Sequence, residues 1–164
     1  MCGLCNQRGL CIGRDMDSIA ETTVETTTPQ VRVRILTTGS REFTDYVLVE
    51  STIAAVWREH GGAPLLLVHG AARGADTLVA RVAASRPDER STAEAHPADW
   101  DKYRPADDDR KNSAGFIRNQ EMVDAGAVVC LAFYRSSARN SGTRDCVRRA
   151  RKAGIPVREV WQAS

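Results

Sequence analysis

The chain has 164 residues, of which 42% are hydrophobic and 27% are charged, and its formal net charge is +2. These values are typical of one soluble globular domain, and they exclude a disordered, fibrous or strongly basic chain. No apolar run approaches the roughly 18 residues of a membrane span, and the N-terminus lacks the apolar segment of a signal peptide. We therefore expect a cytoplasmic protein with no membrane partner and with reduced cysteines.

Residues 1–30 differ from the rest of the chain. The polar stretch 21–30 has little to bury, so we interpret residues 1–30 as a disordered tail and residues 31–164 as the folded domain. The tail contains Cys2, Cys5 and Cys11, which could supply three of the four ligands of a structural zinc site. No fourth Cys or His lies nearby, so the sequence favours incidental thiols without a metal and leaves zinc binding open.

The hydrophobic pattern then alternates between strand and helix. In chain order it predicts a strand at 31–39, a helix at 45–60, a strand at 64–70, a helix at 74–85, a turn at 85–90, an edge strand at 91–97, an irregular segment at 98–115, a helix at 116–126, a strand at 127–134, a helix at 141–154 and a strand at 155–161. Such alternation implies right-handed crossovers. We predict an α/β fold, a Rossmann-like three-layer α/β/α sandwich with a five-stranded, mainly parallel sheet.

Ligands of open parallel sheets bind beyond the carboxyl ends of the strands. Gly39, Ser40 and Arg41 follow the first strand. A glycine there allows a tight turn against a ligand, and a hydroxyl and a guanidinium suit phosphate or ribose. A plain tight turn with an exposed arginine is the alternative.

The loop after the second strand predicts a phosphate site. Gly70, Ala71, Arg73 and Gly74 lead into a helix, so their backbone N–H groups and the helix dipole would face an anion. Asp76, early in that helix, is either its N-cap or the partner of Arg73.

The next two segments add an aromatic and an arginine. Trp100 either stacks on a base or closes the edge of the core, and His96 is either a general acid or base or a structural residue. Arg118 falls at a predicted helix start, where a cation is unfavourable unless it serves a ligand or an acid; a solvated arginine is the alternative. Asn119 and Met122 lie on the same helix, and Met122 shares a face with Arg118.

The last predicted helix opens with Ser141, Gly142 and Thr143. Hydroxyl, glycine and hydroxyl at a helix N-terminus are suited to an anion, although Ser141 alone would serve as an N-cap. The rest of this helix is basic, which fits either a solvated face or contact with a nucleic-acid backbone; its cations are Arg144, Arg148, Arg149, Arg151 and Lys152.

Together these segments resemble the SLOG superfamily in its YspA/cpYpsA-related branch. The resemblance rests on GSR after the first strand, HGAARGADTLVA, HPADW, IRNQEMVDAGA and SGTRDCVRRARKAGIPV, and it covers about residues 31–161. It implies a Rossmann-like pocket for nucleotides or nucleotide-derived ligands, a bacterial or phage origin, and a homodimer or higher homo-oligomer.

The same superfamily includes the Lonely Guy phosphoribohydrolases, which cleave nucleoside 5′-monophosphates. Phe116–Met122 is similar to their M-H-x-R-K-x-x-M motif, which places Arg118 on the functional arginine. Ser141–Thr143 is similar to part of their P-G-G-x-G-T-x-x-E motif, but Arg139 and Asn140 replace the glycine pair. The position of the glutamate falls on Cys146, one residue after Asp145, so the acid is absent or displaced.

Three hypotheses follow. The leading one is a domain that binds a nucleotide or nucleotide derivative without a further cofactor. The second is a nucleotide hydrolase in which Arg118 and Asp145, or the run Asp107–Asp109, supply the catalytic groups. The third is a DNA-binding module, because the DNA-uptake protein DprA shares the superfamily fold.

Overall fold

A computed structural model describes residues 31–85, 91–102 and 113–163. The described elements are β1 (Val33–Gly39), α1 (Tyr46–Glu59), β2 (Leu65–His69), α2 (Ala75–Ala84), β3 (Ser91–Ala95), α3 (Ser113–Asp124), β4 (Val129–Arg135), α4 (Ser141–Lys152) and β5 (Val157–Gln162). The cysteine-containing tail, most of the predicted turn 85–90 and the run Asp107–Asp109 lie outside the described residues.

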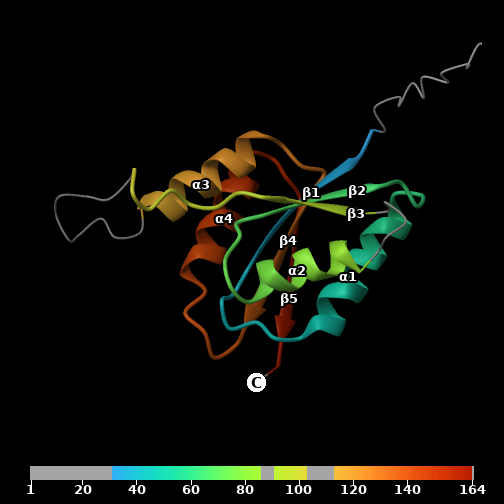
Figure 1. Cartoon of the computed structure of the whole chain (residues 1–164), viewed down its shortest axis with the longest axis horizontal. Helices are drawn as coiled ribbons and strands as arrows, with labels where there is room; N and C mark the ends of the chain where they lie inside the picture. Colours follow the sequence, from blue (N-terminus) through green and yellow to red (C-terminus); the bar gives the residue numbers. More distant parts are fainter. Residues whose placement is uncertain (1–30, 86–90, 103–112, 164) are drawn as a thin grey trace, which may run out of the picture.

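The strands form one sheet in the order β3-β2-β1-β4-β5, and every pair is parallel. The predicted Rossmann-like fold is therefore confirmed, with a fully parallel sheet and with β3 at an edge. In Figure 1, α1 and α2 cover one face of the sheet, and α3 and α4 cover the other. This arrangement brings the loops after β1, β2 and β4 to one end of the sheet.

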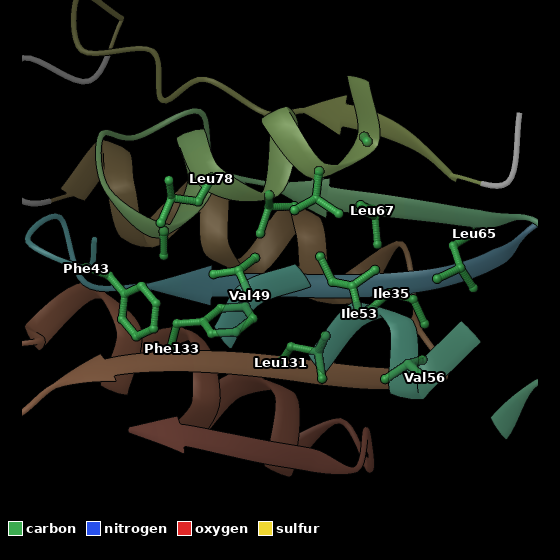
Figure 2. Close-up of a cluster of buried hydrophobic side chains, with 14 residues drawn as sticks. Ile35, Phe43, Val49, Ile53, Val56, Leu65, Leu67, Leu78, Leu131 and Phe133 are labelled. Atoms are coloured by element: carbon green, nitrogen blue, oxygen red, sulfur yellow. The ribbon is translucent and has the colours of Figure 1, made fainter. Parts of the chain in front are cut away.

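The strands are buried on both faces, because successive side chains point to opposite sides. Ile35, Leu67 and Leu131 pack against α1 and α2 in the larger core cluster, which Figure 2 shows together with Phe43 and Phe133. Their neighbours in the strands pack against α3 and α4 instead; among these are Leu36, Val68 and Cys130. Both helix layers are thereby fixed to the central strands that carry the site.

One predicted helix start and one predicted N-cap are wrong. Helix α3 begins at Ser113 and not at Phe116, because its first turn already packs: Ala114 is buried, and Gly115 lies beside Trp100. Helix α4 begins at Ser141 with Asn140 as its N-cap residue, so the prediction of Ser141 as N-cap fails. Asn140 adopts a left-handed conformation that asparagine tolerates, and its amide donates to the Arg135 and Ala138 carbonyls.

Within the described residues, no helix is both long enough and apolar enough to span a bilayer.

Candidate functional site

A cleft of about 280 Å³ lies at the carboxyl ends of the central strands. Residues that follow β1, β2 and β4 form it, together with the first half of α3 and with Trp100 after β3. Its lining residues are Thr38, Gly39, Ser40, Arg41, Glu42, Ala72, Arg73, Asp76, Trp100, Gly115, Phe116, Arg118, Asn119, Ala138, Arg139, Asn140, Ser141, Gly142 and Thr143.

The cleft brings together most of the residues predicted from the sequence as site residues. Those that line it are Gly39, Ser40, Arg41, Arg73, Asp76, Trp100, Arg118, Asn119, Ser141, Gly142 and Thr143. Five others do not line it: Gly70, Ala71, Gly74, Met122 and Asp145. Met122 is 1% exposed and packs in the core beneath α3, because it faces the sheet.

In the loop after β2, the first three N–H groups of the predicted phosphate cradle bond to side chains of the protein. The Ala71 N–H donates to His69 Nδ1 at 3.1 Å, and the Ala72 N–H donates to Asp76 Oδ2 at 3.1 Å. The Gly70 N–H also bonds to Asp76. The protein's own side chains therefore accept the N–H groups of Gly70, Ala71 and Ala72, which the cradle interpretation had assigned to an anion.

The glycines of this region make room for the protein itself and not for a ligand. A Cβ at Gly74 would overlap the backbone of Ser40 and Arg41, and φ at this residue is +81°. A Cβ at Gly39 would overlap Ala75 and Phe133. These glycines allow the start of α2 to lie against the loop after β1, where the Ala75 N–H donates to the Ser40 carbonyl.

Arg118 occupies the space above Gly70. Its Nη1 donates to the Gly70 carbonyl and, at 3.0 Å, to the His96 carbonyl. Burial lowers the pKa of Arg118, and the charge of nearby Asp76 opposes that shift. Because α3 begins at Ser113, Arg118 lies in the second turn and is not the cation at a helix start that the sequence predicted. Its position between two loops still places a cation in the cleft.

Asn119 connects Arg118 to α4. Its Oδ1 accepts from Arg118 Nε at 3.1 Å, and its Nδ2 donates to Asp145 Oδ2 at 3.1 Å and to the Gly142 carbonyl at 3.3 Å. The Asn119 amide is thus engaged by protein groups. Its role is to fix Arg118 relative to α4.

Asp145 does not have the geometry of the predicted catalytic acid. The carboxylate is 7% exposed and accepts from Arg148 and from Arg149 Nε as well as from Asn119. Burial raises its pKa, but these hydrogen bonds and the Arg149 charge outweigh burial, so the pKa is lowered. Cys146, at the position of the phosphoribohydrolase glutamate, is fully buried. Neither residue reaches the cleft.

Asp76 is neither an N-cap nor a partner that holds Arg73. Gly74 is the N-cap residue of α2, and the hydrogen bonds of Asp76 come from backbone groups. The side chain lines the cleft although the residue is only 5% exposed. Burial raises its pKa to about 6, against the opposing effects of the backbone hydrogen bonds and Arg118.

The N-terminus of α4 opens onto the cleft. Asn140 gives no side-chain cap hydrogen bond, and Ser141, Gly142 and Thr143 all line the cleft. A Cβ at Gly142 would meet no atom within 4 Å. The first N–H groups of a helix have no intrahelical partner and carry partial positive charge, so this end favours a negative group.

Several lining residues were not predicted from the sequence. Glu42, Phe116 and Arg139 are the largest of these. Arg139 lies just before α4, so its proximity to Ser141–Thr143 was the available signal. Phe116 was not selected because it was predicted to be the first residue of the helix, whereas α3 begins at Ser113.

Two other predicted features have structural partners. His96 Nε2 lies 2.5 Å from Glu94 Oε1, and that carboxylate also accepts from Arg34, so His96 belongs to a hydrogen-bonded cluster at the β3 edge. On α4, Arg148 and Arg149 pair with Asp145, and Arg151 pairs with Glu159. Much of the basic helix is therefore neutralised by the protein.

The fold and the polar cleft at the carboxyl edge of the sheet define a Rossmann-like α/β domain. The model of the YspA, cpYpsA-related SLOG family matches residues 33–103, which run from β1 past β3. The chain is also 45% identical over 127 residues to the Gene 61 protein of Mycobacterium phage D29, and this match covers 76% of the chain and 93% of the relative. The chain belongs to the YspA/cpYpsA-related SLOG family.

Proposed function

We propose that this protein binds a nucleotide or a nucleotide-derived ligand in the cleft, with the phosphate at the N-terminus of α4. The observation that carries the proposal is the start of α4 at Ser141–Thr143, which has no side-chain cap and faces a cleft lined by arginines. Helix N-termini of this kind bind phosphate through their free N–H groups and the helix dipole.

The charge of the cleft supports an anionic ligand. Four arginines line it: Arg41, Arg73, Arg118 and Arg139. Guanidinium groups form paired hydrogen bonds to phosphate oxygens. Arg118 is held in place by the Gly70 and His96 carbonyls, so it offers a fixed positive charge, whereas the other three are exposed at the rim.

We place the base of the ligand at the end of the cleft that lies away from α4. Trp100 is 48% exposed there, beside Gly115, so its ring is accessible. Aromatic side chains stack on nucleic-acid bases with about 1–3 kcal/mol per base.

Substitutions at Gly142 test the proposal. Space around Gly142 admits a side chain, so Gly142→Asp and Gly142→Asn should both fold. The aspartate places a negative charge where the phosphate would lie, whereas the asparagine is a neutral control of the same shape. We expect Gly142→Asp to weaken binding of AMP or ADP at least about 10-fold in calorimetric titration, and Gly142→Asn to weaken it much less. Tight binding that neither variant alters would overturn this assignment.

A second pair of variants separates the cleft arginines from the general charge of the protein. Arg139→Ala removes a cation from the cleft. The control, Arg58→Ala, removes an exposed cation from α1, which covers the face of the sheet opposite α3 and α4. Only Arg139→Ala should reduce affinity for AMP.

A further inference from the structure

Asp76 differs from the other acidic residues near the cleft. Glu42 is exposed. The Asp145 carboxylate accepts hydrogen bonds from Arg148, Arg149 and Asn119. Asp76 instead lines the cleft while buried, with the neutral N–H groups of Gly70 and Ala72 as its hydrogen-bond donors. Burial of an ionised carboxylate costs free energy, so a buried carboxylate that lines a cavity is a candidate for a functional role.

The chemistry of this carboxyl group restricts what it can contact. Burial raises its pKa to about 6, so at pH 7.5 it is mainly ionised and acts only as an acceptor. An ionised carboxylate has about four acceptor positions, and two backbone N–H groups use only part of them. It would repel a phosphate, so the matching ligand group is a neutral hydrogen-bond donor such as a sugar hydroxyl.

The order of the strands places this carboxylate between the two other candidate contacts. Trp100 follows β3, Asp76 follows β2 and Ser141 follows β4, and the sheet order is β3-β2-β1-β4. Along the edge of the sheet, an aromatic surface is thus followed by a carboxylate and then by a helix N-terminus. A nucleotide has its base, sugar and phosphate in this same order.

We propose that Asp76 accepts hydrogen bonds from the ribose hydroxyls of the ligand, so that the cleft selects ribonucleotides over deoxyribonucleotides. This inference rests on the proposed function, because it names the sugar of the ligand whose phosphate lies at α4.

The test compares sugars in wild type and in Asp76→Asn. Binding constants are measured by calorimetry at pH 7.5 for AMP, GMP, CMP and UMP, and for their 2′-deoxy and 3′-deoxy counterparts. We expect wild type to bind at least one ribonucleotide about 10- to 100-fold more tightly than its deoxy counterpart, which is the effect of a hydrogen bond to a charged group. In Asp76→Asn this preference should fall to about threefold or less. Asp124→Asn, an exposed carboxylate at the end of α3, is the control and should keep the preference.

The outcomes separate the two proposals. If no nucleotide binds to wild type, the proposed function fails and this inference fails with it. If nucleotides bind and Gly142→Asp weakens them, but wild type does not distinguish ribose from deoxyribose, only the inference about Asp76 is overturned. It is also overturned if a folded Asp76→Asn keeps the full preference. If far-UV circular dichroism shows that Asp76→Asn does not fold, a wild type that does not distinguish the two sugars still overturns the inference.

Discussion

Gly70→Ala is the sharpest test of how the cleft is built. The three atoms nearest to a Cβ at Gly70 all belong to the guanidinium of Arg118, and the backbone at Gly70 lies outside the left-handed region, so alanine suits its conformation. The methyl group must therefore displace the guanidinium, which then loses its bonds to the Gly70 and His96 carbonyls. A hydrogen bond from a charged donor contributes about 1.5–3 kcal/mol, and the displaced group regains water in the cleft. We expect the free energy of unfolding to fall by about 1–3 kcal/mol.

A double-mutant cycle isolates this contact. Arg118→Ala removes the atoms that the new methyl group would meet, so Gly70→Ala should cost less than about 0.5 kcal/mol in that background. The free energies of unfolding of wild type, both single variants and the double variant are measured by urea denaturation, followed by far-UV circular dichroism. An equal cost of Gly70→Ala in both backgrounds would refute the conclusion that Arg118 occupies the space above Gly70.

The remaining predictions concern stability. Gly74→Ala should cost at least about 3 kcal/mol in urea unfolding, because φ is +81° and the methyl group meets backbone atoms, whereas Gly142→Ala should stay within about 1 kcal/mol of wild type. The folded-state pKa of Asp76 is raised from 3.8 to about 6, so its ionised carboxyl opposes folding above pH 6, and this cost shrinks as the pH falls toward 4. The stability of Asp76→Asn relative to wild type should therefore be about 1 kcal/mol more favourable at pH 7 than at pH 5. A stability difference between the two proteins that does not depend on pH would contradict this. Asp145→Asn should lose about 2 kcal/mol in the same assay, because an amide cannot neutralise two arginines, while affinity for AMP changes less than threefold.

The fold was predictable because its signals are local. Continuous apolar segments such as 64–70 are typical of strands buried on both faces, and alternation with helices leaves few topologies. The start of α3 was not predictable in this way. Gly115 is a poor helix former and the preceding residues are polar, so only the packing of Ala114 and Trp100 shows that the helix begins at Ser113.

The location of the site was also predictable, because the carboxyl ends of parallel strands converge. What the sequence could not show is which donors and acceptors are already occupied. A glycine-rich loop before a helix has the same composition whether its N–H groups face a ligand or a side chain of the protein. Here His69 and Asp76 accept those N–H groups. Of the two anion positions that the sequence predicts, the proposed phosphate site therefore keeps only the start of α4.

The same distinction decides between two aspartates that look equivalent in the sequence. Arginine and amide donors surround Asp145 and lower its pKa, so it stays ionised and cannot give up a proton near neutral pH. Asp76 has only backbone N–H donors in a buried position, and its pKa of about 6 allows it to exchange a proton there. Cleavage of a glycosidic bond requires an acid or a base beside the reacting atoms, and Asp76 lines the cleft whereas Asp145 does not. Among the described aspartates that the sequence singled out, a hydrolytic reaction in this cleft would therefore have to use Asp76.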